Sequence, residues 1–301
     1  DATREICTAA AAMRDQGKGD IVTFSPKVFI PLTHLCRDFC GYCTFRKDPT
    51  QAGKDLFMTQ EQVLDVANAG AALGCTEALF TLGERPEQRY PEARQWLVHR
   101  GFKTTLEYLT DVCRLVFEET TMLPHANPGT MARREIAALQ PFNPSMGLML
   151  ESTSKALYAQ GGPHEFAPSK RPRVRLRTLE LAGQLRVPFT TGILIGIGES
   201  RRDRIESLLA IAELHAQYGH VQEVIIQNFR AKPDTAMGDS PDAEMEEFLW
   251  TVAVARLILG PEANLQVPPN LSAKDYQIYL DAGINDWGGV SPLTPDFVNP
   301  E

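Results

Sequence analysis

Three of the six cysteines of the chain lie close together, in the stretch PLTHLCRDFCGYCTF of residues 31–45. Cys36, Cys40 and Cys43 are separated by three and then by two residues, so their thiolates can surround one metal centre. A structural zinc site is completed by four ligands, and the sequence offers no second cysteine pair. His34 lies two residues before Cys36, where an extended strand would point both side chains the same way without enclosing an ion. A disulfide framework would leave one cysteine over.

The interpretation that remains is an iron–sulfur cluster held by three cysteines, with one iron open to a ligand that is not protein. An open coordination position indicates chemistry at the cluster. A passive electron carrier is the alternative from another class, but such carriers bind their cluster with four protein ligands. Cys7, Cys75 and Cys113 belong to no motif, and we expect them to be small, buried apolar residues.

The overall composition is that of a globular protein, with 301 residues of which 43% are hydrophobic and 23% charged. The formal net charge of −8 argues against a nucleic-acid partner, because phosphate binding requires a net basic surface. We find no apolar run that could span a membrane and no signal segment, which predicts a cytoplasmic protein with reduced thiols and no membrane partner. The chain begins at Asp1 without an initiator methionine, which suggests a processed protein or a piece of a longer one.

Strand-like runs of β-branched and aromatic residues alternate with segments of helical periodicity over the whole chain. The predicted strands occupy residues 28–36, 76–84, 122–130, 145–152, 189–199, 223–229, 264–270 and 284–289. The predicted helices occupy residues 59–74, 92–101, 104–120, 132–140, 173–186, 203–219, 243–260 and 273–283. Strands that alternate with helices pair in parallel, and eight of them predict an α/β fold closed into a (β/α)8 barrel, with an open doubly wound sheet as the alternative.

We expect two parts in this architecture. Residues 1–26 form an N-terminal helix and lead-in, which closes the other end of the barrel or packs on its side, and residues 27–301 form the barrel as a single domain. In either architecture the carboxyl ends of the strands form the functional rim. Polar residues or glycines end nearly every predicted strand: Cys36, Gly83, Glu84, Asn127, Glu151, Gly196, Gly198, Gln227, Asn228, Asn270 and Asp286. Any chain turns polar at strand ends, but together these residues predict a cleft.

The CxxxCxxC spacing directly after the first predicted strand, with Tyr42 before the last cysteine, resembles the signature of the radical S-adenosylmethionine enzymes. The stretches MGLMLESTS, GGPH, VPFTTGILIGIGES, VPPNLS and DWGGVSPLT extend the resemblance to the deazaflavin-forming branch, from about Lys27 to Pro295. The resemblance implies a TIM-type barrel of the radical SAM kind that holds a [4Fe–4S] cluster. It also implies that S-adenosylmethionine chelates the open iron and is split by the reduced cluster into methionine and a 5′-deoxyadenosyl radical.

The same resemblance implies roles for single residues beyond the three cluster cysteines. Leu82-Gly83-Glu84 replaces the Gly-Gly-Glu element that holds the methionine amino group, so one glycine is missing. Glu151 would contact the ribose hydroxyls, the alternative being a buried acid paired with an arginine. Within the basic run SKRPRVRLR, Arg175 would bind the methionine carboxylate, while most of the run is expected to be a solvated helix start. Cofactor binding is also expected of Tyr42 and of the glycines that would lie against the adenine, Gly196 and Gly198.

The glycines of GILIGIGE also invite a dinucleotide-binding interpretation. A lone partial GxG is weak evidence, however, because the third glycine, the acidic residue after a second strand and an N-terminal position are absent.

The implied substrate is an adduct of a hydroxybenzyl group from tyrosine with a ribitylamino-pyrimidine. The implied reaction closes 5-amino-5-(4-hydroxybenzyl)-6-(ribitylimino)-dihydrouracil to 7,8-didemethyl-8-hydroxy-5-deazariboflavin with loss of ammonia. Amides and hydroxyls suit this molecule, and the expected substrate residues are Asn127, Gln227, Asn228, Asn270 and Ser291. Asp286 or His34 is expected to move a proton, whereas His125 and His164 lie on the rim side without an assigned role.

The implied partners are a small-molecule substrate, an electron donor of the flavodoxin or ferredoxin type, and a tyrosine-using radical enzyme of the same pathway, fused or separate. The alternative within the superfamily is another radical chemistry, either that of the tyrosine-using partner or that of the biotin-synthase, hydrogenase-maturase or menaquinone branches. Extra cysteines for a second cluster would favour some of these, and the sequence has no such group.

Overall fold

The computed structural model describes residues 2–53, 55–271 and 276–299. Within these residues eight strands form one closed barrel in sequence order, every neighbouring pair is parallel, and β8 pairs back with β1. The strands are β1 Thr23–Thr33, β2 Glu77–Leu82, β3 Leu123–Asn127, β4 Ser145–Gly147, β5 Phe189–Ile195, β6 Val221–Asn228, β7 Leu265–Gln266 and β8 Asp286–Val290. The predicted (β/α)8 barrel is therefore confirmed, and the open sheet is not the fold.

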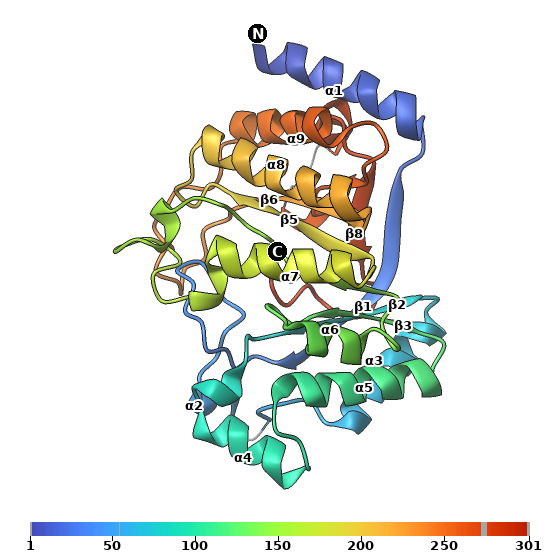
Figure 1. Ribbon diagram of the computed structural model, residues 1–301, viewed down its shortest axis with the longest axis vertical. Coiled ribbons are helices and arrows are strands. Elements are labelled where there is room, and N and C mark those ends of the chain that lie inside the picture. Colours follow the sequence, from blue (N-terminus) through green and yellow to red (C-terminus); the bar gives the residue numbers. More distant parts are fainter. Residues whose placement is uncertain (1, 54, 272–275, 300–301) are drawn as a thin grey trace.

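Helices cover the outside of this barrel (Figure 1). They are α1 Ala2–Lys18, α2 Pro49–Ala52, α3 Gln60–Ala72, α4 Pro91–His99, α5 Thr105–Glu119, α6 Arg133–Leu139, α7 Pro172–Gln184, α8 Arg201–Tyr218, α9 Met245–Leu259 and α10 Gln277–Asp281. Local signals set several helix ends: Thr59 and Ser200 each cap the first turn, and Gly219 ends α8 in a left-handed conformation. Residues 273–275 of the last predicted helix lie outside the described residues.

The N-terminal helix packs on the side of the barrel and does not close its end. Figure 1 shows α1 beside α9, and the Cys7 thiol on α1 donates a hydrogen bond of 3.9 Å to the Leu249 carbonyl on α9. Strand β1 already begins at Thr23, inside the proposed lead-in, so the division at residues 26 and 27 stays a prediction. Among the described residues, no helix has the length and apolar composition that a bilayer crossing requires.

The two faces of the barrel strands carry different side chains, because successive residues of a strand point to opposite sides of the sheet. On β1, Val28, Ile30 and Leu32 are fully buried in the apolar core, and α3 packs on this strand, where Gly70 lies against Val28. The inside is polar where a TIM-type barrel usually carries bulky apolar layers. Its interior residues include Lys27, Glu77, His125, Thr190, Glu223 and Gln266. A polar interior of this kind lacks the apolar packing that would stabilise the barrel. It therefore indicates a binding function.

Candidate active site

The three clustered cysteines follow β1 in a loop at the carboxyl end of the barrel. Cys36, Cys40 and Cys43 line one cavity of about 220 Å³, which we call the cysteine cavity. Segments far away in the sequence fix the backbone of this loop. The Gly41 N–H donates to the Pro163 carbonyl at 2.8 Å, and the Gly41 carbonyl accepts from Met237 at 2.9 Å. The loop is thus held in place by the protein itself.

By residue type, the donors of this cavity fit a cluster with three protein ligands, although the described residues contain no group of three or more His, Cys, Asp or Glu side chains placed to hold a single metal ion. The described lining contains three thiols but no fourth cysteine and no histidine. Burial raises the pKa of Cys36 to about 12 and raises that of Cys40 as well, so both thiols need a nearby positive charge to ionise. An iron–sulfur cluster supplies that charge, because its cysteine ligands bind as thiolates.

The end of β2 packs directly against this loop. A Cβ atom added to Gly83 would lie 2.0 Å from the Leu35 carbonyl oxygen and 2.7 Å from Cβ of Cys36, so only glycine fits there. The Glu84 N–H donates to the Cys36 sulfur at 3.1 Å, and the Glu84 carbonyl accepts from the Arg37 N–H at 2.8 Å. Of the expected Gly-Gly-Glu element, the glycine that remains is the one in contact with the cysteine loop.

The Glu84 carboxylate points toward Thr130. It accepts hydrogen bonds from the Thr130 N–H at 2.9 Å and the Thr130 hydroxyl at 2.6 Å, and only 5% of Glu84 is exposed. Burial raises the pKa of Glu84 above its ordinary value, although these two hydrogen bonds act in the opposite direction. Glu84 therefore joins the cysteine loop to the segment after β3.

A buried ionic cluster forms the opposite side of the cysteine cavity. The Tyr42 hydroxyl donates to Glu151 and lies 2.8 Å from Nε2 of His164, while Lys170 forms an ion pair with Glu151. Nη1 of Arg175 lies 3.7 Å from the same carboxylate. Burial alone would raise the pKa of Glu151, but Lys170 and Arg175 hold it well below its ordinary value. This carboxylate is thus charged at neutral pH.

A second cavity of about 180 Å³ lies inside the barrel next to the cysteine cavity, and we call it the lumen cavity. The two cavities share part of their lining, including Thr81, Asn127 and Gln227. The Thr81 hydroxyl is buried and has no hydrogen-bond partner among the described residues. The rest of the polar lining combines amides and hydroxyls with four titratable residues, Lys27, His125, Glu223 and Asp296. The amides and hydroxyls can bind an uncharged ligand that offers both donors and acceptors.

His125 is a titratable group on the lumen cavity. It is 4% exposed, its Nδ1 lies 2.7 Å from the Ser145 hydroxyl, and Nε2 faces Gly147. Burial lowers the pKa of His125, and the Glu77 carboxylate, 4.0 Å from Nδ1, counteracts this only in part. The Lys27 ammonium lies 2.6 Å from Glu77. The imidazole is therefore neutral at pH 7 and can accept a proton.

The structure brings most of the predicted site residues together. Those that line the cysteine cavity are Cys36, Cys40, Tyr42, Cys43, Gly83, Glu84, Asn127, Glu151, Arg175, Gln227 and Asn228. Asn127, Gln227 and Asn270 line the lumen cavity. Their individual roles stay predictions.

Five predicted residues lie outside the described lining of both cavities: His34, Gly196, Gly198, Asp286 and Ser291. The Gly196 N–H donates to the Glu199 carboxylate at 2.9 Å, and the Ser291 hydroxyl lies 3.0 Å from that of Thr294. Nδ1 of His34 is 2.9 Å from the Phe45 carbonyl, and its ring packs on that of Phe45. These side chains and backbone groups are thus engaged within the fold.

The prediction that Asp286 lies on the rim is wrong. Asp286 begins β8 and pairs with Thr23 at the beginning of β1, so it lies at the amino ends of the strands, opposite the cysteines. Its carboxylate accepts hydrogen bonds from the Thr23 hydroxyl and from the Gly288 N–H. Burial raises the pKa of Asp286. Asp286 ties the two strands that close the barrel.

No role was predicted for three titratable residues that line the cavities, Lys170, His125 and Glu223, nor for His164 beside the cysteine cavity. Lys170 belongs to the basic run that is expected to be a solvated helix start. Its side chain is only 14% exposed, because it forms an ion pair with the buried Glu151. Nε2 of His164 lies 3.2 Å from the same Glu151 carboxylate. His125 and Glu223 lie two and four residues before predicted substrate residues on their strands, and the period-two alternation of a strand would have placed both on the inner face.

Comparisons with known proteins agree with this geometry. The family model described as Radical SAM superfamily matches residues 30–211. An FO synthase of Nocardia farcinica is 54% identical over 100% of this chain and 36% of its own length. A 7,8-didemethyl-8-hydroxy-5-deazariboflavin synthase of Methanopyrus kandleri is 53% identical over 93% of this chain and 84% of its own.

Among solved structures, the FeFe-hydrogenase maturase HydG of Carboxydothermus hydrogenoformans aligns with a TM-score of 0.75. The two sequences are 20% identical, and the alignment covers 96% of this chain and 63% of the HydG chain. This similarity supports the fold alone. The chain spans little more than a third of the length of the FO synthases that it matches.

Proposed function

Because the chain belongs to the radical SAM superfamily and, within it, to the 7,8-didemethyl-8-hydroxy-5-deazariboflavin synthases, we propose that it closes the deazaflavin ring. The substrate is the hydroxybenzyl adduct of the ribityl-pyrimidine, and ammonia is lost. The observation that carries the proposal is the joining of the cysteine cavity to a polar lumen cavity rich in amides and hydroxyls. A radical formed beside the cysteines would meet a substrate held in the barrel.

Cys36, Cys40 and Cys43 would hold a [4Fe–4S] cluster, and S-adenosylmethionine would lie beside it in the cysteine cavity. When bound, these groups supply a carbon radical that removes a hydrogen atom from the substrate. The overall change balances with one S-adenosylmethionine: the substrate gives up a hydrogen atom, an electron, a proton and ammonia. S-adenosylmethionine takes up the hydrogen atom and the electron as it becomes 5′-deoxyadenosine and methionine.

The charged residues of the cysteine cavity would orient S-adenosylmethionine. Lys170 and Arg175 present cationic groups for the methionine carboxylate, and Glu151 can accept hydrogen bonds from the ribose hydroxyls. Gly83 allows the end of β2 to pack closely against the cysteine loop. Tyr42 fixes the Glu151 carboxylate through its hydroxyl.

The lumen residues would bind the substrate and move its protons. Asn127, Gln227 and Asn270 offer amides to the pyrimidine and the polyol, while the orphaned Thr81 hydroxyl offers a further donor. Nε2 of His125 would accept the proton that the substrate loses on ring closure and return it to the departing amine. The residues predicted for this task, Asp286 and His34, lie outside both cavities.

The proposed partners are the substrate, a one-electron donor and the tyrosine-using radical enzyme that makes the adduct. The matched FO synthases are almost three times as long as this chain, which leaves room in them for a second enzyme.

The test supplies the reconstituted protein with reductant, S-adenosylmethionine and either the adduct or free tyrosine. The adduct should yield 5′-deoxyadenosine, methionine, ammonia and a fluorescent deazaflavin, and tyrosine should yield none of them. Neutral amides suit an uncharged polyol better than a zwitterionic amino acid. Deoxyadenosine release with tyrosine but not with the adduct would assign the protein to the partner reaction instead.

A further inference from the structure

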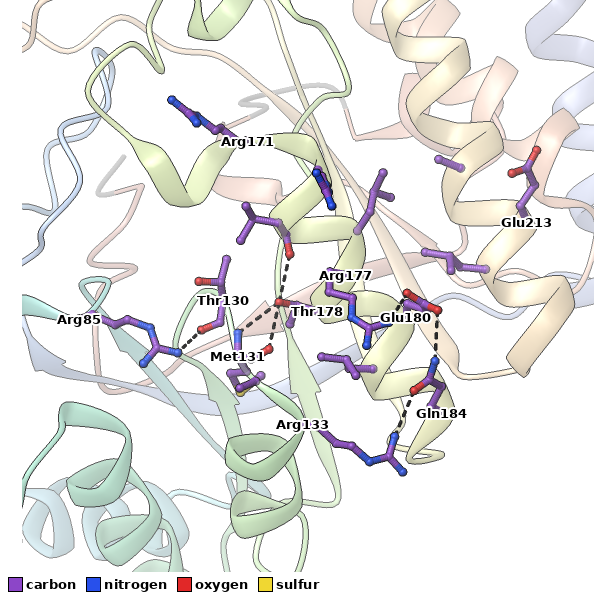
Figure 2. Close-up of a pocket in the computed structure, with 17 residues that line it drawn as sticks. Arg85, Thr130, Met131, Arg133, Arg171, Arg177, Thr178, Glu180, Gln184 and Glu213 are labelled. Atoms are coloured by element: carbon purple, nitrogen blue, oxygen red, sulfur yellow. Dashed lines mark hydrogen bonds and ion pairs between the residues drawn. The ribbon is translucent and has the colours of Figure 1, made fainter.

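A groove of about 1350 Å³ runs over the outer face of the barrel, where α6, α7 and α8 lie side by side. Its lining includes five arginines, namely Arg85, Arg133, Arg171, Arg173 and Arg177. Two glutamates, Glu180 and Glu213, also line it, and Arg85 is paired with Glu135 at 2.7 Å, which leaves a surplus of two positive charges on a chain whose formal charge is −8. We call this surface the arginine groove; Figure 2 shows Arg133 reaching from α6 toward Gln184 on α7.

Much of the positive charge in the arginine groove is available to a partner. Arg171 and Arg173 are exposed and form no ion pair with the described residues. Arg133 is bonded only to the neutral Gln184 amide, at 3.1 Å. Arg177 pairs with Glu180, but 57% of its side chain stays exposed. An apolar side chain, Val174, lies among these arginines with 39% of its surface exposed. Exposed arginines around an apolar side chain suit the docking of an acidic protein.

Direct contacts connect the arginine groove to the cysteine loop. The Cys36 sulfur accepts from the Glu84 N–H, and the Glu84 carboxylate accepts from Thr130. Thr130 lines the groove, where its carbonyl accepts from Arg85 at 3.0 Å. Two residues of the loops after β2 and β3, Glu84 and Thr130, therefore connect the groove to Cys36. The lumen cavity shares no lining residue with the groove among the described residues.

We propose that the arginine groove is the docking surface for a small acidic one-electron carrier, of the flavin or iron–sulfur kind, that reduces the cluster. This inference rests on the proposed function, which requires a reduced cluster. One electron leaves the reduced carrier and enters the cluster, so the carrier is oxidised by one electron and no proton or bond is transferred. Charge complementarity supplies the orientation and speeds the encounter.

The test reverses charge in the arginine groove of the cluster-loaded protein. Arg133→Glu combined with Arg173→Glu changes two exposed arginines that have no acidic partner among the described residues. The matched control, Arg4→Glu combined with Arg202→Glu, makes the same change in net charge on α1 and the exposed side of α8. The probes are a purified acidic flavodoxin and a purified acidic ferredoxin. Calorimetry measures their dissociation constants at low and high salt, and stopped-flow absorbance measures cluster reduction by each carrier and by dithionite.

For at least one carrier, we expect the groove variant to raise the dissociation constant by about tenfold or more at low salt, with the control near wild type and the difference shrinking at high salt. Reduction by dithionite should be equal in all three proteins, which also shows that the variants fold and hold the cluster. Equal carrier binding by the groove variant and the control would overturn the proposal. Carrier binding through the groove without deazaflavin formation would instead count against the proposed function alone.

Discussion

At the scale of single residues, Glu151 holds the site together through both its backbone and its side chain. Its backbone adopts a φ of 65°, which is uncommon for a residue with a side chain and is typical of functional sites. The backbone is held there by β5, since the Glu151 N–H donates to Gly192 and its carbonyl accepts from Leu194. Its side chain binds Tyr42, which lies between two of the clustered cysteines. One residue thus couples the cysteine loop to the barrel.

The cluster cysteines give the first prediction. Replacing Cys36, Cys40 or Cys43 with alanine should abolish the [4Fe–4S] cluster after anaerobic reconstitution, because two thiolates cannot hold it in place. Iron and sulfide analysis with absorption spectroscopy measures the content. The control is Cys75→Ala, a buried cysteine outside the cavity, which should bind iron as the wild type does. Normal iron binding by Cys36→Ala would contradict the assignment.

His125 gives the second prediction, which concerns pH. Because burial lowers the pKa of His125, its imidazole stays neutral down to a pH below the usual value of about 6.5. Deazaflavin formation should fall as the pH drops through that lowered pKa, since the protonated ring cannot accept a proton. The groups that face His125 are Glu77, Lys27 and Glu223, and all belong to the barrel interior.

His125→Asn should therefore reduce deazaflavin formation by roughly 10²–10⁴-fold and flatten this acid limb, while 5′-deoxyadenosine release continues. The ratio of the two products, measured by chromatography between pH 5 and 8, separates proton transfer from radical formation. His215→Asn, on the exposed side of α8, serves as the control. An unchanged pH profile in His125→Asn would remove His125 from the reaction.

At the scale of elements, the ends of short strands decide which residues share a site. β8 is predicted to span residues 284–289, but it begins at Asp286. Ile284 instead donates a hydrogen bond back to Tyr279 of α10, at 3.3 Å. The run INDWGG has no alternation of apolar and polar residues, so nothing in it marks which end of the strand carries the aspartate. In the longer β6 the burial alternates from Val224 to Asn228, and its Gln227 does face both cavities.

The contact between β2 and the cysteine loop gives the third prediction. Gly83→Ala would place a Cβ atom 2.0 Å from the Leu35 carbonyl, and only a backbone shift can relieve that contact. The variant should lose about 1–3 kcal/mol of unfolding free energy and most of its iron, since the shift displaces Cys36. Urea unfolding and iron analysis measure the two effects.

The control for this change is Gly74→Ala, at an open position with a φ of 82°. It should cost about 1 kcal/mol of unfolding free energy through backbone strain and keep its iron. A Gly83→Ala protein with full iron content would show that the loop does not depend on this contact.

At the scale of the whole molecule, the barrel and the cysteine loop could be predicted from the sequence, because both are encoded locally. Helical and strand periodicities recur along the chain, and the CxxxCxxC spacing is contiguous. The ionic cluster of Glu151, Lys170 and His164 could not be predicted, since it depends on how two loops pack across the barrel mouth. The arginine groove likewise arises only when three helices lie side by side.

The polar interior of the barrel also affects how long the folded protein survives. A barrel that encloses Lys27, His125 and Glu223 lacks part of the apolar stabilisation that other barrels draw from their centre. A ligand that binds only the folded state makes up for this by mass action, with about 2.7 kcal/mol at a concentration of 100 times its dissociation constant. The substrate would then act as a folding ligand. In a cell, the supply of substrate would set the protein's resistance to unfolding and proteolysis, and so its abundance.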